Sequence, residues 1–100
     1  MIDEMLKIQK DFQKRFPVET LKFSEIATAI AAEGLEIWHD SDGRWWATPN
    51  MDAEHLKEES IDVLHFLLLL WLKLGMDEKE IFEAYQNKML ENIRRQREGY

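Results

Sequence analysis

The sequence predicts an all-α protein, an antiparallel four-helix bundle that assembles into a homo-oligomer. Apolar residues recur at three- and four-residue steps along most of the chain, which is the spacing of one helix face. Only four glycines and two prolines punctuate the 100 residues, so few turns are available. This length, with 45% hydrophobic and 33% charged residues, is typical of a single globular domain, which we assign to residues 1–100.

Local signals bound the first two helices. We expect the first over residues 2–15, because Pro17 disfavours helical geometry in the residue before it. The second is expected over residues 20–39, with Thr20 or Ser24 as its N-cap.

The second half of the chain follows the same logic. Residues 40–43 (Asp-Ser-Asp-Gly) have the composition of a turn, and residues 44–51 read as an ordered loop. The third helix is expected over residues 52–74, with its first aspartate as N-cap and Gly75 at its C-terminal cap. The fourth is expected over residues 77–96.

The prediction of a homo-oligomer rests on the apolar composition of the third helix. Between Leu64 and Leu72 it is apolar on every face, and such a helix has to be buried all round. A four-helix monomer has difficulty surrounding one helix completely, so we expect a homo-oligomer, either a dimer or a tetramer. The alternative is that the first helix and the tryptophan loop cover this helix within one chain.

Composition excludes several functions. A net charge of −7 argues against nucleic acid as a partner, and the absence of cysteine excludes disulfides and thiolate zinc sites. The four glycines cannot form a phosphate-binding loop. The apolar run at 63–72 is too short for a membrane span, and no export signal is recognisable, so we expect a cytoplasmic protein without membrane contact. Basic residues gather in the last segment, 87–100, where four of them accompany two acidic residues.

Two acidic pairs indicate a metal site. Glu33 and Glu36 form E-x-x-E on the second helix, and Glu59 and Asp62 form E-x-x-D on the third. Each pair shares a helix face, and neighbouring antiparallel helices would bring the four carboxylates together. Oxygen ligands suit Mg²⁺, with Mn²⁺ as a substitute. The alternatives are two solvated helix faces or, less well matched, a di-iron bundle built on Glu36-x-x-His39.

The same pairs introduce a family resemblance. E-x-x-E, 22 intervening residues and E-x-x-D resemble the signature of the all-α nucleoside triphosphate pyrophosphohydrolases, which include the MazG-like proteins and the dimeric dUTPases. The length is close to that of compact MazG-like members. Three segments are similar to the dUTPase branch: residues 6–12 (LKIQKDF), 58–66 (EESIDVLHF) and the spaced Tyr, Lys, Asn, Arg-Gln and Gly-Tyr of 85–100.

The resemblance implies a Mg²⁺-dependent enzyme that cleaves (deoxy)nucleoside triphosphates to monophosphate and pyrophosphate, with deoxynucleotides favoured, in house-cleaning of the nucleotide pool. It implies that the four acidic residues hold the metal. Our own hypothesis for the base that activates water is one of the glutamates of the second helix, Glu36 before Glu33. The resemblance also implies that phosphate and sugar are bound by residues at the C-terminal end, namely Lys88, Asn92, Arg95 and Tyr100.

Aromatic residues leave two interpretations open. Trp45 and Trp46 are candidates for stacking on the base, but they could equally cover the end of the bundle. His39 and His55 are expected at the surface near helix ends, and His65 near the metal-bound carboxylates. The rival to an enzyme is a non-catalytic helical module that binds a partner protein through the third helix.

Overall fold

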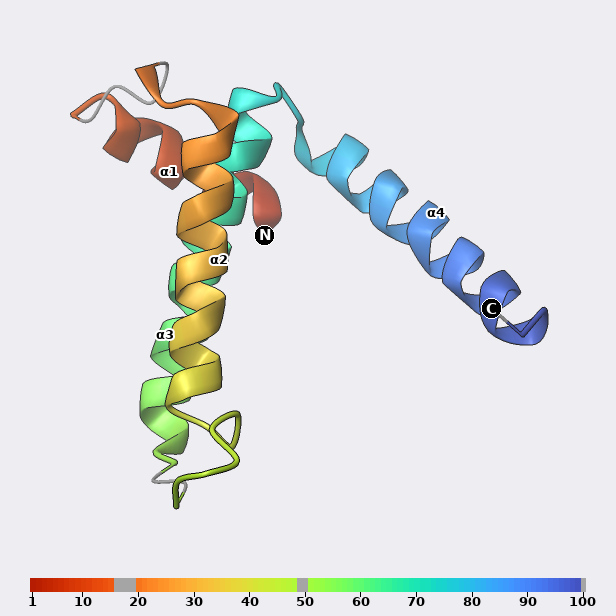
Figure 1. Ribbon diagram of the computed structural model, residues 1–100. Helices are drawn as coiled ribbons and strands as arrows, with labels where there is room; N and C mark the ends of the chain where they lie inside the picture. Colours follow the sequence, from red (N-terminus) through yellow and green to blue (C-terminus); the bar gives the residue numbers. More distant parts are fainter. Residues whose placement is uncertain (16–19, 49–50, 100) are drawn as a thin grey trace.

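A computed structural model describes residues 1–15, 20–48 and 51–99 of the chain. It contains α1 (Ile2–Gln13), α2 (Phe23–His39), α3 (Ala53–Lys73) and α4 (Glu78–Arg97), with no strand among the described residues (Figure 1). The predicted all-α class and the order of four helices are confirmed. The predicted stop of the first helix at Phe16-Pro17 lies outside the described residues.

Most predicted helix caps are present. The Asp52 carboxylate accepts hydrogen bonds from the backbone N–H groups of Glu54 and His55 at the start of α3. Gly75 follows α3 with φ of +73°, a conformation that favours glycine. The cap of α2 was wrongly predicted: Lys22 occupies the N-cap, and its backbone N–H donates to the Glu25 side chain at 3.1 Å. The Glu25 carboxylate therefore satisfies the backbone N–H of the N-cap residue, although no serine or threonine side chain caps the helix.

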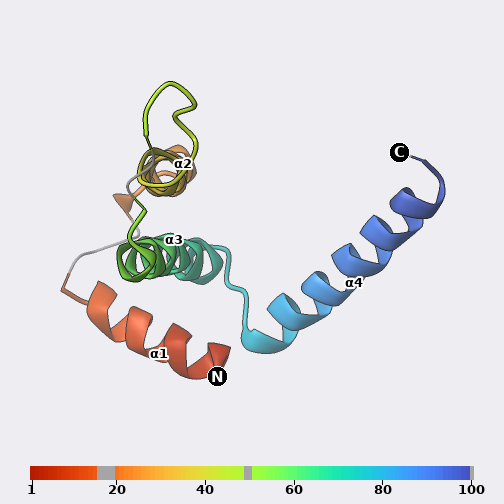
Figure 2. The same cartoon turned by 90° about the horizontal axis from the view of Figure 1, so that it is seen from below.

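The pair α2–α3 forms the centre of the molecule. The two helices run antiparallel and side by side, and α1 packs across α3 (Figures 1 and 2). The buried core of the described residues consists of Leu6, Ile26, Leu68 and Leu69, contributed by these three helices. At one end of the pair the Lys73 ammonium lies 5.0 Å from the centre of the Phe23 ring. This packing fixes which residues of α2 and α3 meet at the other end.

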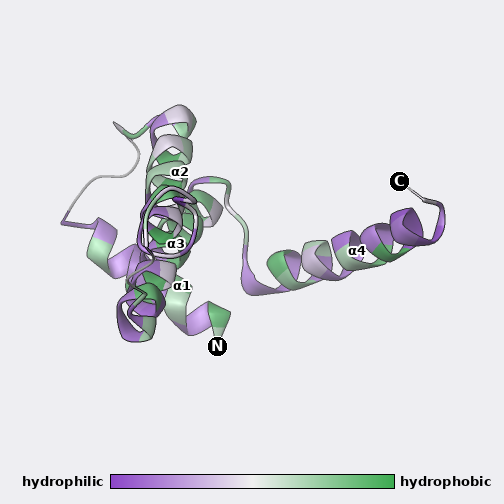
Figure 3. Cartoon of the chain, turned by 60° about the horizontal axis from the view of Figure 1, so that its bottom comes forward, coloured by the Kyte–Doolittle hydropathy of each residue, from purple (hydrophilic) through white to green (hydrophobic). Residues whose placement is uncertain are grey.

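Helix α4 extends away from the other three. It buries no residue, although hydrophobic residues, coloured green in Figure 3, recur along it. The radius of gyration is 16.5 Å, against about 13 Å for a compact 100-residue domain. In this structure one chain therefore does not form a four-helix bundle by itself, because α4 extends away from the other three helices and buries no residue against them. None of the described helices is long and apolar enough to cross a bilayer.

The core gives a stability prediction. Ile26 is only 1% exposed, between α2 and α3. Ile26→Ala should lower the free energy of unfolding by about 2–5 kcal/mol, because it removes buried methylenes and leaves a cavity. Leu35→Ala on the same helix is the control, since Leu35 is 62% exposed. Urea unfolding of both variants checks this, and equal losses would contradict the assigned core.

Candidate functional site

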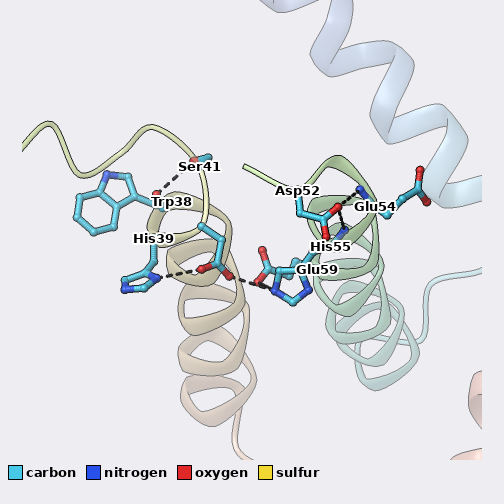
Figure 4. A network of polar contacts seen from close by, with 8 residues as sticks. Trp38, His39, Ser41, Asp52, Glu54, His55 and Glu59 are labelled. Carbon is cyan, nitrogen blue, oxygen red and sulfur yellow. Dashed lines mark hydrogen bonds and ion pairs between the residues drawn. The ribbon is translucent and has the colours of Figure 1, made fainter. Parts of the chain in front are cut away.

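Three metal-ligating side chains converge where α2 ends and α3 begins. Asp40 is the C-cap of α2, while His55 and Glu59 lie one turn apart on α3. The His55 Nε2 atom lies 3.2 Å from Asp40 Oδ2 and 3.0 Å from Glu59 Oε1 (Figure 4). One ligand atom from each residue lies within 4.8 Å of the other two. We refer to Asp40, His55 and Glu59 as the triad.

The local sequence holds the triad in place. The Asp40 backbone N–H donates to the Glu36 carbonyl at 2.9 Å, which fixes the aspartate on the last turn of α2. The side chain of Asp52 caps α3 and thereby anchors the turn that carries His55. The Nδ1 atom of His39 lies 3.0 Å from the second oxygen of Asp40. Both oxygens of Asp40 are therefore engaged, and its orientation is fixed.

Glu59 is the unusual member. Its residue is only 6% exposed, and its Oε2 atom is buried without a hydrogen-bond partner among the described residues. A buried carboxylate oxygen without a partner costs free energy. A bound cation would supply the missing partner, so the burial of this oxygen fits a metal ligand.

The carboxyl groups of Glu59 and Asp40 shift each other's pKa in opposite directions. Their mutual hydrogen bond raises the pKa of Glu59, with burial and the negative charges of Asp40 and Glu36 adding to the rise. The same hydrogen bond, together with that from His39, lowers the pKa of Asp40 to about 2. The nearby charge of Glu59 raises the pKa of His55. Two carboxyl groups and an imidazole therefore lie close together, and a cation bound between them would favour their deprotonated forms.

The structure brings part of the predicted metal set together. Glu59 belongs to the triad, and Glu36 lies close enough for its charge to act on Glu59. Glu33 is half-buried on the preceding turn of α2, and Asp62 is exposed on the following turn of α3. Neither Glu33 nor Asp62 belongs to the triad.

Asp40 and His55 were not predicted from the sequence as site residues. Asp40 was interpreted as part of a turn, which it is, and His55 as a surface residue. His55 is indeed half exposed, but its ring also contacts two carboxylates. The four-residue spacing of His55 and Glu59 was the available signal, because it places both on one helix face.

The tryptophans form a cluster on the surface. The ring centres of Trp38 and Trp46 are 6.0 Å apart, and those of Trp45 and Trp46 are 5.7 Å apart in an edge-to-face arrangement. Trp38 points away from the triad (Figure 4). Gly43 lies against the Trp38 ring, where a Cβ atom would collide with it. Trp45 and Trp46 remain exposed, so they do not cover the end of a bundle in the single chain.

The predicted phosphate-binding residues lie elsewhere in the chain. Lys88 and Arg95 are on α4, where Glu91 pairs with Lys88 at 3.8 Å and with Arg95 at 2.7 Å. Asn92 is exposed on the same helix. Because α4 extends away, the structure does not bring these residues to the triad of their own chain (Figures 1 and 2). Tyr100 lies outside the described residues.

The fold and the triad together describe an all-α protein with a site suited to a divalent cation. No model of a known protein family matches the chain, and no solved structure matches it. Two curated proteins do: the dCTP pyrophosphatases of Enterobacteria phages T4 and LZ5 are 41% and 43% identical to it over 49 residues. The match covers 49% of this chain but only 29% and 28% of those relatives, so the chain spans less than a third of their length in the comparison.

Proposed function

We propose that the protein is a divalent-metal-dependent nucleotide pyrophosphohydrolase of the MazG-like and dimeric dUTPase-like class. It converts a (deoxy)nucleoside triphosphate to the monophosphate and pyrophosphate, in house-cleaning of the nucleotide pool. The observation that carries the proposal is the buried oxygen of Glu59, which has no hydrogen-bond partner in the described part of the chain and lies beside carboxylates from α2. The similarity to two phage dCTP pyrophosphatases supports it and makes dCTP the first deoxynucleotide to test.

The metal ligands in this proposal are the two acidic pairs, Glu33, Glu36, Glu59 and Asp62. The negative charge of Glu36 acts on Glu59, and the Glu59 oxygen that is buried without a hydrogen-bond partner among the described residues is suited to bind a cation. Mg²⁺, or Mn²⁺ in its place, would neutralise the triphosphate and promote ionisation of a water. The chain's own part is to hold four oxygens from two packed helices at one position.

Other side chains act directly on water and substrate. Glu36 is exposed, and we assign it the role of base that takes the proton of the attacking water, with Glu33 second. Lys88 and Arg95 stabilise the charge on the leaving pyrophosphate, and Asn92 and Tyr100 bind sugar or phosphate. Trp45 and Trp46 stack on the base, which their exposure supports.

The test of this proposal is pyrophosphate release. Purified protein with Mg²⁺ is incubated with each common deoxynucleoside and nucleoside triphosphate, and both pyrophosphate and monophosphate are quantified. We expect stoichiometric release, with dCTP and the other deoxynucleotides ahead of the ribonucleotides. Release of inorganic phosphate together with the nucleoside diphosphate would contradict cleavage between the α and β phosphates.

The homo-oligomer is also part of the proposal. The solvent-accessible surface area of the chain is 8094 Å², whereas a compact monomer of 12.0 kDa has about 6000 Å². An apolar groove of about 750 Å³ lies between α1, the end of α3 and α4, and includes Trp71, Ile81, Phe82 and Tyr85. The excess area is of the size that each subunit of an obligate dimer buries. We propose a second copy of the chain as the occupant of this face.

Assembly also gives Lys88 and Arg95 a site to act on. We propose that α4 of one copy reaches the acidic residues of the other, because these cations lie away from the triad of their own chain. Charge complementarity supports this, since 87–100 is basic within an acidic protein.

Mixing two inactive variants tests this sharing. Glu59→Gln lacks a metal ligand, and Lys88→Ala/Arg95→Ala lacks the cations. After co-refolding, activity should return to roughly a quarter of wild type, because half of randomly formed dimers are mixed and each holds one intact site. Each variant alone is the control. A site contained within one chain predicts no recovery.

The rival function is a non-catalytic module that binds a partner protein, which the exposed apolar face of α4 favours. Thermal denaturation distinguishes the two. An enzyme should gain stability with Mg²⁺ and nucleotide, by about 2.7 kcal/mol at a hundred times Kd. Asp62→Asn should lose the metal response while melting at the wild-type temperature without metal. An interaction module would respond to neither ligand.

A further inference from the structure

A second set of side chains that could bind a metal lies at the end of the α2–α3 pair. The triad combines one imidazole nitrogen with two carboxylate oxygens, whereas the two acidic pairs offer oxygen alone. Only Glu59 belongs to both sets. Asp40 and His55 could therefore bind a metal ion independently of the four-carboxylate site.

The two distances from His55 to the carboxylates of the triad suit a small dication. Protein ligands bind Zn²⁺ at about 2.0–2.2 Å, so two ligand atoms at the corners of a tetrahedron lie roughly 3.3 Å apart. His55 Nε2 lies 3.2 Å from Asp40 Oδ2 and 3.0 Å from Glu59 Oε1. One ring nitrogen thus faces both oxygens across the spacing that a shared ion requires.

A second, independent observation points to a ligand. The Glu59 side chain is 7% exposed, and its Oε2 atom is buried with no hydrogen-bond partner among the described residues. A purely structural ion pair with His55 would leave that oxygen unsatisfied. A cation at the triad can be bound by either oxygen of Glu59.

The surroundings of the triad resemble those of known metal ligands in one further respect. His39 Nδ1 lies 3.0 Å from Asp40 Oδ1, the oxygen that does not face His55. Such an outer contact orients a ligating carboxylate and is a common feature of metal sites. Both α3 ligands also project from a helix whose first turn is held by the Asp52 cap.

From this geometry we infer that Asp40, His55 and Glu59 form a binding site for a first-row transition-metal dication, of the class of Mn²⁺, Co²⁺ and Zn²⁺. The imidazole nitrogen makes the site selective for these ions over Mg²⁺, which prefers oxygen ligands. Three protein ligands leave a coordination position for water or for a phosphate oxygen. The inference shares Glu59 with the proposed function but does not depend on hydrolysis.

The test is direct binding of metal ions to the purified, metal-free protein. Calorimetric titrations with Zn²⁺, Mn²⁺ and Mg²⁺ alone give the affinities, and the visible absorption of bound Co²⁺ reports nitrogen ligation. His55→Gln and Asp40→Asn should each weaken Zn²⁺ and Mn²⁺ binding by at least about tenfold. His65→Gln is the matched control, because His65 is exposed on the same helix about 15 Å further along.

Circular dichroism and thermal melting without metal establish that each variant folds. Zn²⁺ binding tighter than Mg²⁺ binding, lost in His55→Gln and kept in His65→Gln, would support the inference. Equal Zn²⁺ affinity in wild type and folded His55→Gln would overturn it. Mg²⁺-dependent hydrolysis that survives in His55→Gln would leave the proposed function intact, whereas Zn²⁺ binding through His55 without any hydrolysis would refute only that function.

Discussion

Glu59→Gln is expected to abolish pyrophosphate release, with a fall in kcat of about 10²–10³-fold, the size typical of removing one preorganised electrostatic group. The substitution keeps the shape of the side chain but removes the charge that the cation requires. Steady-state kinetics with Mg²⁺ and dCTP measure the effect. Activity that persists at the wild-type level would contradict the central place of Glu59.

The same variant should fold at least as well as the wild type when no metal is present. The hydrogen bond with Asp40, burial and the neighbouring negative charges raise the pKa of Glu59, so its ionised form opposes folding above that pKa. A neutral amide removes this penalty, and the melting temperature at neutral pH should therefore stay equal or rise. If Glu59→Gln lost both activity and folded structure, the loss of activity could be attributed to unfolding and not to the missing metal ligand.

Glu58→Gln provides a matched control. Glu58 is the adjacent residue on α3 but is exposed, and it forms no part of the triad. It carries the same charge, so Glu58→Gln changes the net charge of the protein equally. We expect near-normal turnover. A comparable loss in both variants would indicate a general electrostatic effect.

The sequence predicts well those features that depend on neighbouring residues. The cap at Asp52 and the glycine after α3 were correct, because each depends on a few adjacent side chains. The cap of α2 was wrong because the first turn closes without a hydroxyl: the Glu25 side chain accepts from the Lys22 backbone N–H, and the Lys22 carbonyl accepts from the Glu25 backbone N–H.

Features that depend on packing were harder to predict. Asp40 meets His55 across 15 residues of sequence. That contact is set by how α2 lies on α3, which periodicity does not determine. The direction of α4 is a similar case: its apolar stripe predicts that it packs on something, but not on what. The acidic pairs were found because they are spaced within single helices.

The apolar stripe of α4 leads to the second large effect, the dissociation of the proposed dimer. Phe82 is 59% exposed in the single chain and belongs to the groove assigned to a second copy. Phe82→Asp would place a charge in that interface, at a cost of about 2–4 kcal/mol for each copy. In a two-fold dimer the change acts twice, so Kd should rise by roughly a thousandfold or more.

Light scattering during size-exclusion chromatography measures the result. Wild type is expected at twice the chain mass of 12.0 kDa or a higher multiple, and Phe82→Asp at the mass of one chain. Asn87→Asp is the control, since it adds the same charge on the opposite side of α4, five residues along at about 100° each. If the wild type has the mass of one chain, the groove and α4 require a different partner, and the interaction module becomes the better account of this face. If Phe82→Asp is a monomer that still hydrolyses dCTP, the site is complete within one chain and α4 serves assembly alone.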